Sequence, residues 1–213
     1  MSPLLETKRV FDGGPGNLRL FETIRIVNGE PSNLRLHENR LNQSRRKLFG
    51  IIGQISLADH ISIPDDCLTG VYRCRVIYEE SIISVEFIPY QPAAVRTLKV
   101  VHADEIDYGL KYLDRTSLTG LIDHDVADDV LIVKNGCVTD TSYSNIVFTD
   151  GRKWVTPDTP LLQGTMREKL LREGAIKKER ITPVDLGRFT HFRLINAMLG
   201  FDAPLLPVKN IVR

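Results

Sequence analysis

The chain has 213 residues and carries 28 lysines and arginines against 27 aspartates and glutamates, so its formal net charge at pH 7 is +1. A nearly neutral chain has no strong uniform field, which argues against non-specific nucleic-acid binding. With 42% hydrophobic residues, 15 glycines and 11 prolines, the composition is that of an ordinary globular protein rather than a disordered or repetitive one.

No membrane or metal partner is expected from the sequence. The longest stretch without a charged residue, 48–58, is about half as long as a membrane-spanning helix. Residues 1–6 lack the basic start and apolar stretch of a secretory signal, which indicates a cytoplasmic protein. Cys67, Cys74 and Cys137 are odd in number and scattered, so they predict buried thiols rather than a disulfide framework or a zinc site.

The first part of the chain predicts a lobe of strand, helix, strand and strand after a glycine-rich loop at 12–16. Alternating apolar residues indicate a strand at 18–27, and the pair at 28–29, Asn-Gly, is typical of a hairpin turn. An amphipathic helix is expected at 36–50, where Gly50 would end it, with a basic outer face of Arg45, Arg46 and Lys47. Two strands at 70–78 and 81–90 follow.

A Pro-Ala-Ala segment at 92–94 breaks the pattern and indicates a linker. We therefore place a boundary near residue 95, between a small lobe (1–95) and a larger lobe (96–213). The larger lobe is expected to contain a strand at 97–102, a helix at 116–124, a hairpin at 130–148 turning at 135–136, a strand at 153–155, a helix at 165–174 and a returning strand at 192–199. The alternation of predicted helices and strands indicates an α+β or α/β architecture in both lobes.

Three short motifs could hold chemistry, and each also has an ordinary structural explanation. Gly164 and Thr165 stand at a predicted helix start, where unpaired N–H groups and the helix dipole favour an anion such as phosphate. Lys111 has apolar neighbours, which lower the pKa of an amine and make it nucleophilic toward carbonyls, although most lysines are solvated. Asp140 and Asn145 bound a polar cluster that alone indicates a turn.

Taken in order, six motifs resemble those of the class IV aminotransferases, the fold-type IV pyridoxal-phosphate enzymes. They are Phe21-Glu-Thr-Ile-Arg25, His37-Glu-Asn-Arg-Leu41 with Ser44, Gly109-Leu-Lys-Tyr-Leu-Asp-Arg115, Val138-Thr-Asp-Thr-Ser-Tyr-Ser-Asn-Ile146, Thr156-Pro157 and Leu162-Gln-Gly-Thr-Met-Arg167. The resemblance runs from about residue 18 to 208. It implies a two-lobed enzyme like D-amino-acid aminotransferase, with a shortened first lobe, that uses pyridoxal 5'-phosphate.

The resemblance also implies roles for individual residues. Lys111 would bind the cofactor covalently and move the substrate proton, and Arg40 would grip the cofactor phosphate. Asp140 would face the pyridine nitrogen, where the family usually has a glutamate that reaches about 1.5 Å further. The other residues expected to bind the cofactor are Asn145, Gly164, Thr165, Met166, Asn196 and Ala197. Thr23, Arg25, Arg75 and Arg115 are expected to bind substrate.

Within the family, the segments 109–115 and 164–167 are most similar to 4-amino-4-deoxychorismate lyase, which gives 4-aminobenzoate and pyruvate in folate biosynthesis. This reaction needs a pocket for two carboxylates, for which Arg25, Arg73, Arg75 and Arg115 are available. An aminotransferase of branched-chain or D-amino acids with a 2-oxo acid acceptor stays open, as does a non-catalytic relative used as a binding or scaffold protein.

A homodimer is expected on two grounds. The resemblance implies a paired active site, and a short first lobe would leave apolar side chains of the strand at 18–27 poorly covered. Leu18, Leu20, Ile24 and Ile26 are the side chains concerned. The expected small-molecule partner is an amino substrate.

Overall fold

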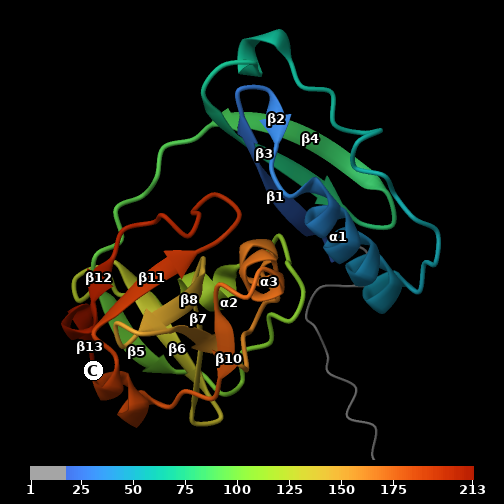
Figure 1. Cartoon of the computed structure of the whole chain (residues 1–213). Helices are drawn as coiled ribbons and strands as arrows, with labels where there is room; N and C mark the ends of the chain where they lie inside the picture. The colour runs from blue at the N-terminus through green and yellow to red at the C-terminus, as the bar shows by residue number, and fades with distance from the viewer. Residues whose placement is uncertain (1–17) are drawn as a thin grey trace, which may run out of the picture.

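The computed structural model describes residues 18–213, so the glycine-rich loop expected at 12–16 lies outside the described residues. Four antiparallel strands form the first sheet, in the order β2-β1-β3-β4. They are β1 (Leu20–Val27), β2 (Glu30–Pro31), β3 (Val71–Tyr78) and β4 (Ile82–Pro89). The helix α1 (Leu34–Phe49) packs on one face of this sheet (Figure 1).

The alternation along β1 gives the first sheet two different faces. Leu20, Ile24 and Ile26 are 0% exposed and belong to the core beneath α1. Thr23 and Arg25 point the other way, toward the second lobe, because successive side chains of a strand alternate between faces. The expectation of uncovered apolar surface on this strand is therefore wrong for these three core residues, and it gives no support to a dimer.

The turn residues of the first lobe behave as predicted. Asn28 and Gly29 have positive φ angles of 49° and 79° and connect β1 to β2, which confirms the hairpin. Gly50 ends α1 in the left-handed conformation at φ 71°, and its N–H donates to the carbonyl of Arg46. The helix begins two residues earlier than expected and ends where the glycine predicted.

The predicted basic face of α1 is only partly correct. Arg45 is 6% exposed, and its guanidinium donates to the side chain of Asn42 and to the carbonyls of Gly53 and Glu80. These acceptors satisfy the group inside the protein, because burying a charged group without partners is unfavourable. Arg45 therefore connects the helix to two loops, and the exposed positive charges of this segment are Arg46 and Lys47.

Two further sheets form the second lobe, with strand orders β13-β5-β6-β7 and β10-β9-β8-β11-β12. Their strands are β5 (Leu98–His102), β6 (Asp129–Lys134), β7 (Cys137–Thr141), β8 (Asn145–Thr149), β9 (Trp154–Pro157), β10 (Lys177–Glu179), β11 (His191–Ile195), β12 (Leu206–Pro207) and β13 (Ile211–Val212). The helices are α2 (Thr116–Thr119) and α3 (Thr165–Arg172), and short 3-10 helices occur at Asp65–Cys67, Pro183–Arg188 and Val208–Asn210.

The stretch expected as one hairpin at 130–148 divides into three strands. β6 and β7 pair around the predicted turn at 135–136, but β8 belongs to the other sheet. The chain bends between them because the Thr141 hydroxyl accepts the N–H groups of Tyr143 and Ser144, while the N–H of Thr141 donates to the carbonyl of Ser144. This bend carries several residues of the candidate site.

Other differences concern short elements. The helix expected at 116–124 stops at Thr119 and gives way at Gly120 to a series of turns, consistent with the low helix propensity of glycine. The strands β10, β12 and β13 have two or three residues each, which is too short to produce a periodic signal. Their pairing partners lie in distant parts of the chain.

The main core of the second lobe lies between its sheets and contains the packed aromatic rings of Phe148, Phe189 and Phe192. The three cysteines are buried and unpaired, as the sequence predicts. Within residues 18–213, no helix has the length and apolar character needed to cross a membrane, and no three His, Cys, Asp or Glu side chains gather in a way that could hold a metal ion.

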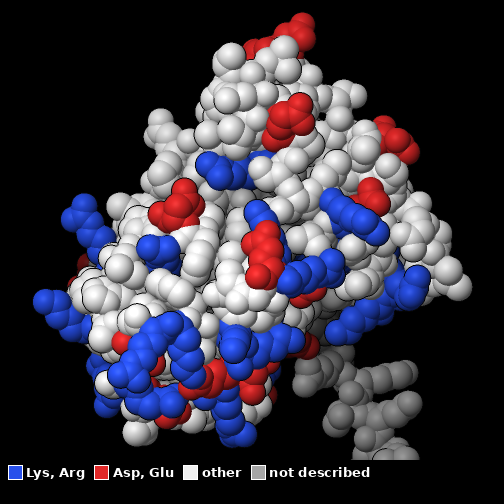
Figure 2. All heavy atoms as spheres, in the orientation of Figure 1, with Lys and Arg blue, Asp and Glu red and all other residues white. Residues whose placement is uncertain are grey.

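The two lobes are joined by residues 90–97, which form neither helix nor strand. They meet again where α1 and α3 lie side by side (Figure 1). The boundary near residue 95 stays a prediction. Basic and acidic side chains lie beside one another on the face shown in Figure 2, in keeping with the nearly balanced charge.

Candidate active site

A cavity of about 1030 Å³ separates the first sheet from the second lobe. This volume suits a ligand of cofactor size together with a small substrate. The predicted site residues that line it are Thr23, Arg25, Arg40, Lys111, Arg115, Asp140, Asn145, Gly164, Thr165, Asn196 and Ala197. Two predicted residues do not line it. The Arg75 guanidinium lies 5.6 Å from the centre of the Phe21 ring, and Met166 packs into the core against Val147.

Lys111 is held on the edge of the first sheet by its own backbone. Its carbonyl accepts the N–H of Phe21 at 3.0 Å, and the next residue, Tyr112, forms a β-bridge with Leu20. The amine lies 4.5 Å from the centre of the Phe21 ring. Burial, together with the positive charges of Arg40 and Arg115, lowers the pKa of Lys111 to about 7 against the opposing effect of Glu22. A substantial fraction of this amine is therefore neutral at neutral pH.

Arg40, on α1, is held by a carboxylate from β1. Its Nε and Nη2 atoms donate to the two oxygens of Glu22 at 2.8 and 2.5 Å, and its Nη1 atom donates to the carbonyl of Gln163 at 3.2 Å. Glu22 is 0% exposed, and Arg40 is the largest influence that lowers its pKa, to about 2, against the effect of burial. A guanidinium carries five N–H groups, so two remain for a ligand in the cavity.

His37 extends this pair toward the second lobe. Its Nδ1 atom lies 2.7 Å from Glu22, and its Nε2 atom lies 3.3 Å from the hydroxyl of Thr165. Burial lowers the pKa of His37 below its usual range, so the ring is neutral at neutral pH. Because an ionised carboxylate can only accept, Nδ1 carries the proton and Nε2 accepts from Thr165.

The start of α3 forms one end of the cavity. A Cβ atom on Gly164 would lie 1.9 Å from the Oδ1 atom of Asn145, so any larger residue would displace the Asn145 side chain. Thr165 is the first residue of the helix. The first N–H groups of a helix have no partner within the helix and favour an anion. Arg40 and the start of α3 thus offer a phosphate-sized anion two kinds of donor from two lobes.

Asp140 is 5% exposed at the end of β7 and lines the cavity. Its oxygens accept hydrogen bonds from the side-chain amide of Asn145 at 2.8 Å and from the backbone N–H of Leu162 at 2.9 Å. The backbone N–H of Leu161 donates a third hydrogen bond to the carboxylate. Burial raises the pKa of Asp140 to about 6. Two carboxylate oxygens offer about four acceptor positions, so one remains for a donor in the cavity.

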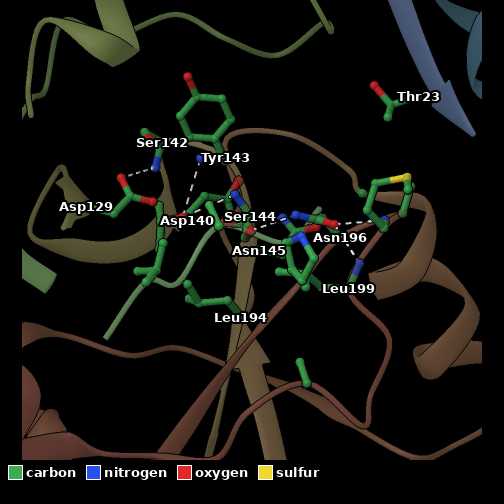
Figure 3. A pocket seen from close by; sticks show the side chains of 18 of the residues that line it. Thr23, Asp129, Asp140, Ser142, Tyr143, Ser144, Asn145, Leu194, Asn196 and Leu199 are labelled. Atoms are coloured by element: carbon green, nitrogen blue, oxygen red, sulfur yellow. Dashed lines mark hydrogen bonds between the residues drawn. The ribbon is translucent and has the colours of Figure 1, made fainter. Parts of the chain in front are cut away.

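The bend between β7 and β8 is tied to a second turn, at 196–199. The side-chain oxygen of Asn196 accepts the N–H groups of Met198 and Leu199 at 2.8 Å each, and its amide donates to the hydroxyl of Ser144 at 2.9 Å. Figure 3 shows Ser144, Asn196 and Leu199 close together, with Thr23 apart from them. These hydrogen bonds join the bend between β7 and β8 to the turn at 196–199.

Two arginines on opposite walls keep unused donors. The Nε atoms of Arg25, on β1, and of Arg115, before α2, are buried and have no hydrogen-bond partner within residues 18–213. Arg115 donates through Nη2 to the carbonyl of Ser142, and its guanidinium lies 3.8 Å from the centre of the Tyr143 ring. Arg73 pairs with Arg25 across β1 and β3 and also lines the cavity. This arrangement suits a ligand with negative charges at two points.

Sequence reasoning did not single out Glu22 or His37. The signal was present, because Glu22 occupies an inward position of an alternating strand where an apolar residue is expected. His37 and Arg40 are one turn apart on α1 and therefore share a face. The buried Asp129, which accepts the N–H of Ser142 and lines the cavity, was also missed, since nothing in its local sequence distinguishes it.

Known proteins resemble this chain over nearly its full length. The family model described as amino-transferase class IV matches residues 109–211. A protein of Haemophilus influenzae described as an uncharacterized protein is 40% identical over 203 residues, which is 94% of this chain and 100% of the relative. The crystal structure of a "putative 4-amino-4-deoxychorismate lyase" from Haemophilus somnus is 38% identical, covers 86% of this chain and 98% of that one, and has a TM-score of 0.81.

A more distant structure shares the fold. It is a hypothetical aminotransferase of Mycobacterium tuberculosis in a pyridoxal-phosphate-bound form, with 19% identity, a TM-score of 0.71 and coverage of 88% of this chain and 80% of that one. The chain belongs to the class IV aminotransferase family and is an enzyme of the pyridoxal-phosphate-dependent lyase or aminotransferase type.

Proposed function

We propose that this enzyme binds pyridoxal 5'-phosphate through Lys111 and cleaves 4-amino-4-deoxychorismate to 4-aminobenzoate and pyruvate. The observation that carries the proposal is a lysine with a lowered pKa inside a cavity that is also lined by Arg25 from the first sheet and by Arg115. The 38% identity to the Haemophilus somnus protein supports the same reaction. Under this proposal the enzyme acts in folate biosynthesis in the cytoplasm, and the family resemblance supports a homodimer.

The donor set of the cavity fits pyridoxal phosphate. Arg40 has two free N–H groups beside the start of α3, which suits the phosphate. Asp140 keeps one acceptor position, which suits the protonated nitrogen of a pyridine ring. Lys111 has the partly neutral amine that attack on an aldehyde requires. These three residues would hold the two ends and the reactive carbon of the cofactor.

When bound, pyridoxal phosphate supplies an electron-withdrawing ring that stabilises negative charge on the substrate carbon next to the amine. Asp140 would face the ring nitrogen and favour its protonated form, since a buried carboxylate favours a cation opposite it. Lys111, with a pKa near neutrality, takes the proton from the substrate carbon as its general base. Arg40 and the start of α3 would hold the phosphate and so orient the cofactor toward Lys111.

Substrate selection is proposed to depend on the arginines of the cavity. 4-Amino-4-deoxychorismate has two carboxylates, and elimination releases one of them in pyruvate. Arg25, supported by Arg73, would bind one carboxylate from the first sheet, and Arg115 would bind the other from the second lobe. Tyr143 stacks on Arg115 and limits its movement. A monocarboxylic amino acid would leave one of these arginines without a carboxylate opposite it and would therefore bind less tightly.

The test is to supply 4-amino-4-deoxychorismate to the cofactor-loaded enzyme without any 2-oxo acid. We expect 4-aminobenzoate and pyruvate in equal amounts over many turnovers, because elimination regenerates the starting enzyme. A Lys111→Gln variant should release neither product, and an Arg46→Gln variant, changed at an exposed position of α1, should behave as the unaltered enzyme.

Spectra in the presence of leucine, glutamate or a D-amino acid test the alternative. If one of these bleaches the visible absorbance and 2-oxoglutarate restores it, while 4-amino-4-deoxychorismate is left unchanged, the enzyme is an aminotransferase and the lyase proposal fails. If the protein acquires no visible absorbance with pyridoxal phosphate, the cofactor proposal fails and a binding or scaffold role is favoured.

A further inference from the structure

Glu22 lies at the centre of a buried network that joins the two lobes. Its carboxylate accepts from Arg40 and His37, both on α1, and His37 contacts Thr165 at the start of α3. A carboxylate on the inward face of a strand is costly unless it is paired and hydrogen-bonded. Here both oxygens are bonded, so the network is complete without any ligand.

The network fixes the direction in which Arg40 points. Two bonds to one carboxylate hold the plane of the guanidinium, and the bond to the carbonyl of Gln163 holds its remaining edge. The two unused N–H groups are therefore aimed before any ligand arrives. An arginine without such a partner would lose side-chain freedom on binding and hold an anion less tightly.

His37 connects Glu22 to the second lobe. With Nδ1 donating to Glu22, Nε2 accepts the proton of the Thr165 hydroxyl at 3.3 Å. The bond fixes the first residue of α3 against α1, although the two residues are 128 positions apart in the sequence. The spacing between Arg40 and the helix start is thus set by side chains that do not line the cavity, since neither Glu22 nor His37 belongs to its lining.

We propose that Glu22 and His37 are positioning residues for the cofactor phosphate: Glu22 aims Arg40, and His37 holds the start of α3 at the matching distance. This inference rests on the proposed function, which places the phosphate between Arg40 and Thr165. It predicts a specific effect on phosphate recognition, because neither residue lines the cavity and any influence of their charges on Lys111 is the same for ligands with and without a phosphate.

The experiment compares two probes that differ only in the phosphate, pyridoxal phosphate and pyridoxal, titrated against the apoprotein and followed by visible absorbance. The unaltered protein should bind pyridoxal phosphate more tightly than pyridoxal, and the ratio of the two affinities is its preference. Glu22→Gln keeps the shape but replaces an acceptor by a donor, and it should reduce the preference about 10- to 100-fold. His37→Asn keeps a donor toward Glu22 but loses the contact with Thr165, and it should reduce the preference about 3- to 10-fold.

Glu38→Gln is the matched control. Glu38 lies on the same helix and accepts the N–H of Leu57 at 2.8 Å, outside the cavity lining. This variant should keep the preference of the unaltered protein. If Glu22→Gln does not fold, as a thermal melt would show, the His37→Asn variant decides the question.

Each outcome has a separate meaning. If the unaltered protein binds both probes equally well, the proposed placement of the phosphate is wrong, whatever the variants do. If the unaltered protein prefers pyridoxal phosphate and the folded variants keep that preference within twofold, the positioning role is overturned. If a variant binds both probes more weakly by the same factor, the positioning role is also overturned, because that result indicates a structural defect rather than lost phosphate recognition.

Discussion

The amine of Lys111 should be reactive at neutral pH because its pKa is lowered from 10.5 to about 7 by burial and by the positive charges of Arg40 and Arg115. About half of these amines would then be neutral at pH 7, compared with roughly 3 in 10,000 for a solvated lysine. Arg40→Met removes a positive charge and leaves the Glu22 carboxylate without its main partner. Both changes favour the protonated amine, so the pKa of Lys111 should rise.

The assay is timed labelling of the apoprotein with a small neutral amine reagent over a range of pH, followed by peptide mass mapping. The labelling rate at Lys111 should rise with pH and reach half its maximum near pH 7 in the unaltered protein. The half-maximum should move upward in the Arg40→Met variant. Arg46→Met, at an exposed position of the same helix, is the control, whereas Arg45 is unsuitable because it is buried. A half-maximum near 10 in the unaltered protein, or the same half-maximum in all three proteins, would refute the electrostatic reasoning.

Three further predictions concern the same site. Gly164→Ala should lower the free energy of unfolding in urea by about 1–3 kcal/mol, because its Cβ atom would lie 1.9 Å from Asn145. Gly53→Ala is the control and should leave this free energy nearly unchanged, because its Cβ atom would have no atom within 4 Å. Equal urea midpoints for the two variants would contradict the prediction. Glu22 has a folded pKa of about 2 against 4.5 for the free side chain, so it contributes roughly 3 kcal/mol that is present above pH 4.5 and lost as the pH falls through 2. Glu22→Gln should therefore show thermal melts that vary less with pH over that window, and an unchanged pH profile would count against the ion pair. Borohydride reduction with pyridoxal phosphate should add to the peptide of Lys111 the mass of the cofactor less one water plus two hydrogens, and an adduct on another lysine would disprove the assignment.

The sequence predicted the regular elements of the first lobe closely. Alternation along β1, the Asn-Gly turn at 28–29 and the glycine after α1 are local signals, and the structure contains the strand, the turn and the helix end that they indicate. Short-range sterics and backbone hydrogen bonding control such features, so they are visible in a few neighbouring residues. Most of the site residues that the collinear motifs indicated likewise line one cavity.

Other features could not be predicted from neighbouring residues. Arg45 looks like part of a solvated basic run, but loops at 53 and 80 provide its acceptors. Met166 lies beside Thr165 in the sequence and turns into the core, because α3 presents different faces to the cavity and to the second lobe. The expected hairpin divides at 142–144 because β8 pairs with β11, a strand far along the chain, in the other sheet. In each case the deciding partner is distant in the sequence.

By itself the sequence determined which chemical groups are available: an amine at Lys111, a guanidinium at Arg40, a carboxylate at Asp140 and a glycine at 164. Only the tertiary structure decided their properties. The pKa of Lys111 falls because folding removes its water and brings Arg40 and Arg115 near, and the direction of Arg40 is set by Glu22. Desolvation and charge interactions depend on distances in space, and those distances exist only once β1, α1 and α3 have packed together.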